Sequence, residues 1–259
     1  MEVKIFKNYQ ELCFEAAQEF LKVFQENKEK SQIPIMLAGG TTILGVEKVL
    51  AELFENQIDW QKIHLFWGDE HIVSQTHPKN NYSLAAEALK NILKIIPPKN
   101  LKPILTEDKD GVFDLPKAQL EAKRYSLMVA KALENFGGKF PLVFLGMGDD
   151  LHTASLLPER PPFENPAFEA KELFVAIEYP QDIYPENSTP LRISLTPHFL
   201  FNFAQKVVLL VSGEKKKEAL DLLLKTNLNI KKFPATILKL LENSFLFADE
   251  LTILRENKS

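Results

Sequence analysis

Cysteine is almost absent from this chain: Cys13 is the only one, so neither an intramolecular disulfide nor a cysteine-based metal cluster can form. No apolar run approaches the roughly 20 residues that a membrane-spanning helix needs. The N-terminal stretch MEVKIFKNYQELCFEAAQEF lacks the apolar centre of a signal peptide. A net charge of −4 provides no electrostatic attraction to nucleic acid or to an acidic membrane surface. We therefore expect a cytoplasmic protein that binds neither nucleic acid nor membrane.

Arginine is scarce as well, because four of the 31 basic residues are arginine and the rest are lysine. One of the four, Arg192, stands at the entry to a predicted strand in TPLRISLT. Its planar guanidinium suits phosphate oxygens, although an ordinary surface arginine is the alternative. Lys215, Lys216 and Lys217 begin a predicted helix, where positive charge opposes the helix dipole. A bound anion would stabilise these lysines; a solvated cluster is the other interpretation.

Short apolar runs alternate with longer amphipathic ones along the 259 residues. Apolar residues at helical spacing predict helices over residues 11–26, 42–55, 82–93, 117–136 and 214–225. Apolar runs predict strands over residues 33–38, 62–67, 140–148, 173–178, 191–196, 206–213 and 244–249. This alternation indicates an α/β fold with a doubly wound, mostly parallel sheet and helices on both faces. No linker, repeat or low-complexity segment divides the chain, so we expect a single domain over residues 1–259, with 158–197 as an elaborated loop.

Three predicted strands end in loops of unusual composition, LAGGTT, FWGDEH and GMGDDLHTAS. In a doubly wound sheet, ligands bind beyond the carboxyl ends of the strands, so we expect the three loops to converge on one crevice. The first loop brings Gly39, Gly40, Thr41 and Thr42 to the start of a helix, whose free N–H groups attract anions such as phosphate. The alternative is a plain turn in which a threonine caps the helix.

The second loop carries Asp69, Glu70 and His71 at a strand end. Acidic side chains there can hold sugar hydroxyls or orient a base, and the alternative is a solvated turn in which Asn80 caps the next helix. A zinc site built on His71 and His77 fits poorly, because their spacing matches no helical or finger pattern. We expect no metal at this site.

The third loop is the most specific of the three, because His152 follows closely on a strand end. A neutral imidazole can remove a proton from water near neutral pH, and Asp149 or Asp150 could fix its tautomer. A nucleophilic Ser155 is the rival interpretation, but the G-x-S-x-G elbow is missing. A structural His152 that caps a following helix is the other alternative.

Together these segments resemble the 6-phosphogluconolactonase family, part of a larger sugar-phosphate isomerase group that includes glucosamine-6-phosphate deaminase. The resemblance runs through LAGGTT, FWGDEH…NNYS, LGMGDDLHTASLLP, LRISLT, VSGEKKKEAL and FPATIL…FLFAD. It covers nearly the whole chain in the right order, and the segment around HTASLLP is its most specific part.

The resemblance implies an enzyme that hydrolyses 6-phosphogluconolactone to 6-phosphogluconate in the oxidative pentose phosphate pathway, without a metal or an organic cofactor. It implies that His152 is the general base and that Asp150 is its partner. It also implies that the phosphate is held by the glycine loop, Arg192 and Lys216, and that Asp69 shapes the sugar end. The substrate-binding set is then Gly39, Gly40, Thr41, Thr42, Asp69, His71, Arg192 and Lys216.

The chain departs from the family pattern at three places. His71 replaces an arginine, Leu151 replaces a glycine between the aspartate and the histidine, and a family lysine is missing around Asn187. A protonated His71 could take over part of the arginine's role. Two rival functions stay open: a deaminase-like enzyme, which would carry a carboxylate where this chain has Leu157, and a sugar-phosphate-binding protein that has lost catalysis.

Overall fold

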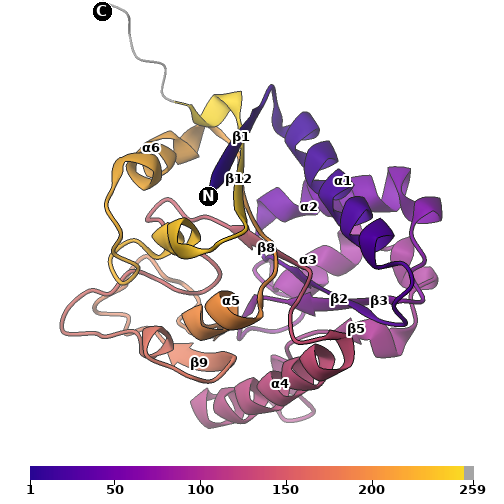
Figure 1. Cartoon of the computed structure of the whole chain (residues 1–259). Helices are drawn as coiled ribbons and strands as arrows, with labels where there is room; N and C mark the ends of the chain where they lie inside the picture. Colours follow the sequence, from indigo (N-terminus) through magenta and orange to yellow (C-terminus); the bar gives the residue numbers. More distant parts are fainter. Residues whose placement is uncertain (254–259) are drawn as a thin grey trace, which may run out of the picture.

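A computed structural model describes residues 1–253, and at its centre lies a sheet of seven strands (Figure 1). The strand order is β1-β12-β11-β8-β2-β3-β5 and every neighbouring pair is parallel. The strands are β1 (Glu2–Phe6), β2 (Ile33–Leu37), β3 (Ile63–Trp67), β5 (Leu101–Lys102), β8 (Leu142–Gly146), β11 (Val207–Val211) and β12 (Ser244–Asp249). The predicted doubly wound α/β fold is confirmed.

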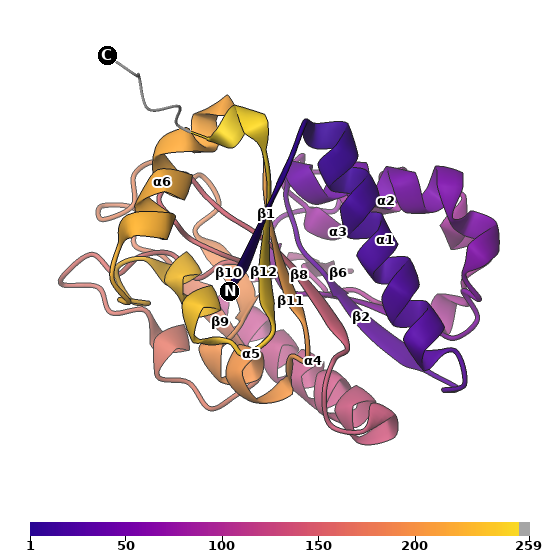
Figure 2. The same cartoon turned by 45° about the horizontal axis from the view of Figure 1, so that its top comes forward.

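Helices cover both faces of the central sheet (Figure 2). One face carries α1 (Tyr9–Asn27), α2 (Thr41–Leu53) and α3 (Asn81–Ala88). The other face carries α4 (Leu115–Phe136), α5 (Pro197–Phe203) and α6 (Lys217–Lys225). Short 3-10 helices span Glu55–Gln57, Ile92–Lys94, Pro98–Asn100, Pro166–Phe168, Glu214–Lys216, Pro234–Leu240 and Glu250–Thr252, and β6 (Glu107–Asp108) forms a small hairpin with β7 (Gly111–Val112).

Residues of the central strands alternate between two buried clusters, one on each face of the sheet. In β8, Leu142 and Phe144 pack on the side of α1 and α2, whereas Val143 and Leu145 pack on the side of α4 and α6. Side chains alternate along a strand with a period of two, so a strand that is covered on both faces is apolar throughout. The continuous apolar runs in the sequence follow from this arrangement.

Two predicted strands lie outside the central sheet. β9 (Phe174–Glu178) and β10 (Leu191–Leu195) form a separate antiparallel sheet with β4 (Asp69–His71), in the order β4-β10-β9. No helix intervenes between β9 and β10, so the direct connection makes them antiparallel neighbours rather than members of a parallel βαβ unit. This second sheet places Arg192 opposite His71 in register.

The sequence-based expectations also omitted β1 and α5. β1 is an edge strand whose EVKIF sequence mixes charged and apolar residues, so it has no fully apolar run. The seven-residue α5 is too short for a clear helical period, although Thr196 caps it by accepting a hydrogen bond from the N–H of Phe199. The predicted end of α4 at Gly137 and the predicted cap of α3 by Asn80 are both confirmed.

The chain crosses from one half of the central sheet to the other between β2 and β8. After β2 it continues to β3 and β5, and it then returns through α4 to β8 on the other side of β2. β2 and β8 pair through Ile35–Leu142 and Met36–Val143, whereas β2 and β3 pair along their full length. A crevice at the carboxyl ends of the strands is expected at such a crossing point.

Glu47 is a fully buried acidic residue on α2, and neither of its carboxylate oxygens has a hydrogen-bond partner within the described residues. Burial raises its pKa from the ordinary 4.5 to about 8. The carboxyl group therefore takes up a proton on folding at pH values between these two, and folding is linked to pH through it.

We expect Glu47→Gln to remove one component of the pH dependence of stability. Because the folded-state pKa is raised, the stability contributed by the protonated group is present below pH 4.5 and is lost as the pH rises to about 8. Between these two pH values, the contribution of Glu47 to the free energy of unfolding falls by at most about 1.4 kcal/mol per pH unit. Urea unfolding between pH 5 and 8 should show the variant gaining stability over the wild type as pH rises. The exposed Glu52 on the same helix supplies the control variant, Glu52→Gln; a constant difference across the range would contradict the prediction.

Candidate active site

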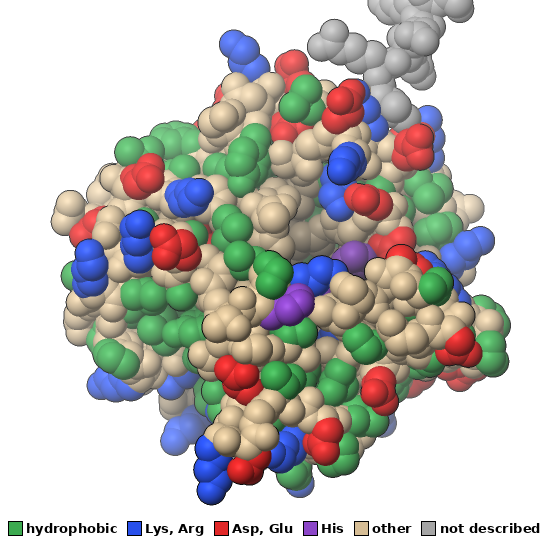
Figure 3. All heavy atoms as spheres, turned by 180° about the vertical axis from the view of Figure 1, so that it is seen from behind, with side chains coloured by type: hydrophobic (Ala, Val, Ile, Leu, Met, Phe, Trp, Pro, Cys, Tyr) green, Lys and Arg blue, Asp and Glu red, His purple; other side chains and the backbone are tan. Residues whose placement is uncertain are grey.

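A pocket of about 390 Å³ opens at the carboxyl ends of the central strands. Its lining residues are Ala38, Gly39, Gly40, Thr41, Thr42, Gly68, Asp69, His71, Pro78, Lys79, Asn81, Leu84, Leu145, Gly146, Met147, Gly148, His152, Ala154, Arg192 and Lys216. They come from all three of the loops that the sequence singled out, and they include His152 with every predicted substrate-binding residue. A hollow bordered by His and by Lys or Arg side chains is visible in Figure 3.

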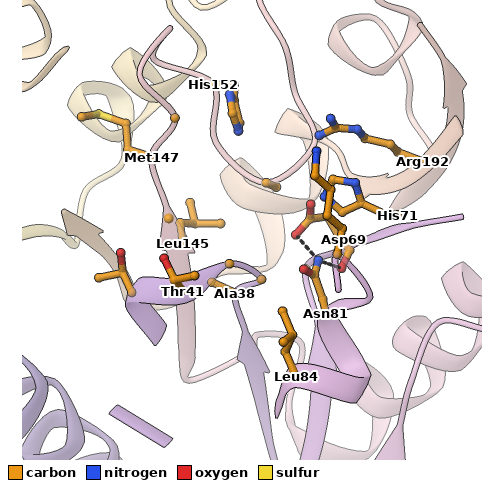
Figure 4. A pocket seen from close by; sticks show the side chains of 18 of the residues that line it. Ala38, Thr41, Asp69, His71, Asn81, Leu84, Leu145, Met147, His152 and Arg192 are labelled. Atoms are coloured by element: carbon orange, nitrogen blue, oxygen red, sulfur yellow. Dashed lines mark hydrogen bonds between the residues drawn. The ribbon is translucent and has the colours of Figure 1, made fainter. Parts of the chain in front are cut away.

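His152 faces the pocket from the loop after β8 (Figure 4). Its Nδ1 lies 2.5 Å from Oδ1 of Asp150, and its backbone N–H donates to the same oxygen at 3.0 Å. Burial acts to raise the pKa of Asp150, but the hydrogen bonds and the charge of His152 outweigh burial and lower the pKa to about 2. An ionised Asp150 can only accept, so Nδ1 carries a proton, and in the neutral form of the imidazole Nε2 is the acceptor. A Cβ at Gly148 would lie 2.0 Å from Nδ1, so the position of the ring requires glycine there.

The loop that holds His152 contains no helix for His152 to cap. The chain folds back on itself, because the N–H of Gly148 donates to the carbonyl of His152 at 2.8 Å. The capping alternative is therefore wrong. Leu151 adopts a left-handed conformation with φ of 64°, which costs about 1–2 kcal/mol. Its side chain is 1% exposed within the core, and burial of a leucine contributes about 1.5–3 kcal/mol. The gain from packing offsets the backbone cost at this departure from the family pattern.

Asp69 lies beneath the pocket, and its side chain is directed toward the same space as His152 and Arg192 (Figure 4). Its Oδ2 accepts a hydrogen bond from Oγ of Ser155 at 2.7 Å, and its carbonyl accepts one from Nδ2 of Asn81 at 3.0 Å. Burial raises the pKa of Asp69, and the bond from Ser155 acts against this effect. Ser155 is fully buried and its hydroxyl is committed to Asp69, so the structure argues against a nucleophilic serine.

His71 is held as a neutral side chain. Its Nδ1 lies 2.5 Å from Oγ1 of Thr189. Burial lowers its pKa to about 2, and the positive charges of Arg192 and Lys79 act in the same direction. The expectation that a protonated His71 takes over part of the missing arginine's role is therefore wrong, because burial and the neighbouring cations disfavour a positive charge at this position.

Arg192 enters the pocket from β10 and is 7% exposed. Its Nη2 donates to Oδ1 of Asn187 at 2.5 Å, and its Nε donates to the carbonyl of Thr189 at 3.1 Å. Its guanidinium also lies over the ring of Tyr179. Asn187 lies where the lysine of the family pattern is missing, and it is a neutral partner that orients Arg192.

Two lysines of the cluster at the start of α6, Lys216 and Lys217, are paired with carboxylates of the chain itself. Nζ of Lys216 lies 2.6 Å from Oδ1 of Asp149, and Nζ of Lys217 lies 2.8 Å from Oε1 of Glu214. Lys216 lines the pocket as predicted. Asp149 and Glu214 thus place negative charge beside two lysines that the helix dipole disfavours.

The glycine loop begins α2 without a threonine cap. Gly40 is the N-cap residue, with φ of 83°, and α2 starts at Thr41; within the described chain no side chain caps this end. The alternative of a threonine N-cap is wrong. The N–H groups of the first turn face the pocket end of the helix, where an anion is favoured.

Tyr9 of α1 reaches into the first turn of α2. Its hydroxyl donates to the carbonyl of Thr42 at 3.1 Å and accepts from the N–H of Gly45 at 3.0 Å. Burial raises the pKa of Tyr9, which keeps the hydroxyl protonated. A Cβ at Gly45 would lie 2.3 Å from this oxygen, so glycine makes the close approach possible. Tyr9 is a structural support for the loop that the sequence did not identify.

Two pocket residues with polar side chains, Asn81 and Lys79, were not among the predicted site residues. Asn81 was visible as half of the pair Asn80-Asn81, but the pair was interpreted only as a cap. Lys79 stands in the polar stretch HPKNN, which has the composition of an ordinary solvated loop, and it lines the pocket. No local pattern distinguishes it, because its role depends on the second sheet.

The residues weighed as metal ligands do not form a metal-binding group. Within residues 1–253, no group of three or more histidine, cysteine, aspartate or glutamate side chains is arranged to hold a metal ion. Among the same residues, no helix has the length and apolar character needed to cross a bilayer.

Comparison with known proteins identifies the class to which this fold and pocket belong. The chain matches the family of glucosamine-6-phosphate isomerases/6-phosphogluconolactonase over residues 7–246, and it is a member of that family. It is 30% identical over 235 residues to the 6-phosphogluconolactonase of Haemophilus influenzae, with 90% of each chain covered. It is 32% identical over 214 residues to that of Synechocystis sp., with 82% of this chain and 79% of the relative covered. The resemblance inferred from the motifs is confirmed.

Solved structures agree with this assignment. The crystal structure of the devB protein superimposes with a TM-score of 0.77 at 27% identity and 97% coverage of each chain. A monomeric glucosamine-6-phosphate deaminase has a TM-score of 0.74 at 22% identity, covering 97% of this chain and 98% of the other. At 22% identity, the similarity to the deaminase establishes only that the two proteins share a fold.

We expect Tyr9→Phe to loosen the first turn of α2, because the partly buried N–H of Gly45 loses its acceptor. The loss of such a hydrogen bond costs about 1–3 kcal/mol. Urea unfolding should show a reduced free energy of unfolding, and hydrogen exchange should be faster at the amide of Gly45. Tyr82→Phe on α3 is the matched control, because the ring of Tyr82 packs on Trp67. Equal exchange at Gly45 in both variants would exclude the supporting role of Tyr9.

Proposed function

We propose that this chain hydrolyses 6-phosphogluconolactone to 6-phosphogluconate, as the names of its relatives in Haemophilus influenzae and Synechocystis sp. suggest. The observation that carries the proposal is the pair of His152 and Asp150 at a pocket whose lining also includes Arg192, Lys216 and the first residues of α2. We place the reaction in the cytoplasm, and the substrate is a small sugar phosphate.

His152 acts as the general base. Asp150 accepts the hydrogen bond from Nδ1–H, which leaves Nε2 to take a proton from water. The resulting hydroxide oxygen attacks the lactone carbonyl carbon and forms a tetrahedral intermediate with a negatively charged oxygen. Asp150 stabilises the imidazolium that is formed at the same time.

The intermediate collapses by cleavage of the bond between the carbonyl carbon and the ring oxygen. The imidazolium returns its proton to the departing ring oxygen, which becomes the hydroxyl group of the open-chain product. The carbonyl carbon leaves as a carboxylic acid that ionises at neutral pH. The protein residues are unchanged at the end, and the cycle requires no metal and no organic cofactor.

The phosphate group binds at the opposite wall of the pocket. The N–H groups of Gly40, Thr41 and Thr42 at the start of α2, with Arg192 and Lys216, hold its oxygens. Asp69 holds hydroxyl groups of the sugar, supported by Ser155 and Asn81. This assignment positions the lactone carbonyl next to His152.

The identity of residue 157 argues against the deaminase alternative. A deaminase of this group would carry a carboxylate at this position, but Leu157 is apolar and 4% exposed. The pocket thus lacks that proton-transfer group, whereas the base that the lactonase reaction needs is present and oriented by Asp150.

We expect His152→Ala to lower turnover of the lactone by about 10²- to 10⁴-fold, the usual contribution of a general base. Thermal unfolding should be nearly unchanged, because the side chain is 32% exposed at the pocket. The measurement follows acid release from freshly generated 6-phosphogluconolactone and subtracts the spontaneous hydrolysis.

The matched control is His198→Ala on α5, because His198 does not line the pocket. It should retain wild-type turnover. If His152→Ala keeps near-full activity, His152 is not the base. If the wild-type protein itself does not accelerate hydrolysis, the proposed function is wrong, and the impaired binding protein takes its place.

A further inference from the structure

The three cations that line the pocket differ in their partners. Lys216 is paired with the carboxylate of Asp149. Arg192 donates to the neutral oxygens of Asn187 and Thr189. Nζ of Lys79 donates to the neutral hydroxyl of Ser188 at 2.8 Å, and in residues 1–253 it forms no ion pair. The wall formed by Lys79 and Arg192 is therefore the part of the lining whose positive charge is not neutralised by a partner.

We infer that Lys79 is a substrate-binding residue, whose ammonium group contacts anionic oxygens of the sugar phosphate. The inference rests on the proposed function and adds a residue to it. A phosphate monoester carries about −1.5 to −2 charges at pH 7, and hydrolysis of the lactone adds a carboxylate. With Lys216 already paired and His71 neutral, Lys79 supplies the complementary charge beside Arg192.

The backbone at Lys79 is held in place just before α3. Its N–H donates to Nδ1 of His77 at 3.1 Å, and the N–H of Asn80 donates to the carbonyl of His77 at 2.9 Å. The side chain of Asn80 then caps α3 by accepting from the N–H of Ser83. The residue therefore projects from a hydrogen-bonded turn, even though its side chain is exposed.

The far end of the side chain is held by Ser188, on the connection between β9 and β10. A hydroxyl releases the ammonium to an anion at a lower cost than a carboxylate would, because a hydroxyl carries no negative charge to compete with the ligand. Contacts at both ends reduce the conformational entropy that Lys79 loses on binding. Ser188 is thus a positioning residue for Lys79.

The test is a titration of 6-phosphogluconate into the full-length protein, with the heat of binding measured by calorimetry. We expect Lys79→Met to weaken binding about tenfold, the usual effect of losing a hydrogen bond to a charged group. Lys79→Arg should retain most of the affinity, and added salt should reduce the difference between Lys79→Met and the wild type. In turnover, the loss should appear in KM rather than in kcat. Thermal unfolding should be unchanged for an exposed side chain.

Lys90→Met is the matched control, because Lys90 is exposed near the end of α3, pairs with Glu87 and does not line the pocket. Parallel titrations with inorganic phosphate and with gluconate identify which end of the ligand Lys79 meets. A loss confined to inorganic phosphate and 6-phosphogluconate assigns the phosphate, and a loss confined to gluconate and 6-phosphogluconate assigns the carboxylate. Either result supports the inference.

Equal binding by Lys79→Met and Lys90→Met would overturn the inference, as would a wild-type protein that binds none of the three anions. These outcomes are separable from failure of the proposed function. A wild-type protein that hydrolyses the lactone, with equal binding by the two variants, refutes the role of Lys79 alone. A wild-type protein that binds 6-phosphogluconate but does not hydrolyse the lactone refutes the reaction, and the variants still decide whether Lys79 contacts the ligand.

Discussion

A parallel sheet that is wound in both directions must contain a position where two neighbouring strands send their connections to opposite faces. Here the two strands are β2 and β8, whose registered pairing ends after Met36–Val143. The loop after β2 supplies the glycine turn that lines the pocket, and the loop after β8 supplies His152. The pocket depends on this separation, because continued pairing of the two strands would close the space between the loops. The other lining residues of the pocket lie around this opening.

The second sheet completes the pocket by making polar side chains meet across strands. β10 lies antiparallel to β4, so Arg192 faces His71 and Ser194 faces Asp69 in register. Burial, together with the neighbouring cations, keeps His71 neutral, and the buried carboxylate of Asp69 accepts hydrogen bonds from the hydroxyl of Ser155 and the side-chain amide of Asn81. The site therefore holds several ionisable groups at short range without requiring all of them to be charged.

The central strands and the three loops could be predicted from the sequence because their signals are local. An apolar run such as FPLVFLGMG predicts a buried strand without reference to the rest of the chain. The position of His152, four residues after this run, then follows directly from the sequence. The second sheet could not be predicted, because β9 and β10 look like any other apolar run and their pairing with β4 depends on distant chain segments. The neutral state of His71 and the pocket position of Lys79 follow from that pairing, so they were hidden for the same reason.

The hydroxyl of Tyr9 sits inside the hydrogen-bond ladder of α2, between the carbonyls of its first turn and the N–H of Gly45. It takes the place that a water molecule would occupy in a frayed helix end, but it is tethered to α1. The first turn of α2 is therefore tied to the first helix, although α1 contributes no residue to the pocket lining. In folding terms, the hydrogen bonds of this turn are complete only when α1 has docked, so the order of a pocket-lining turn is coupled to that of the N-terminal segment.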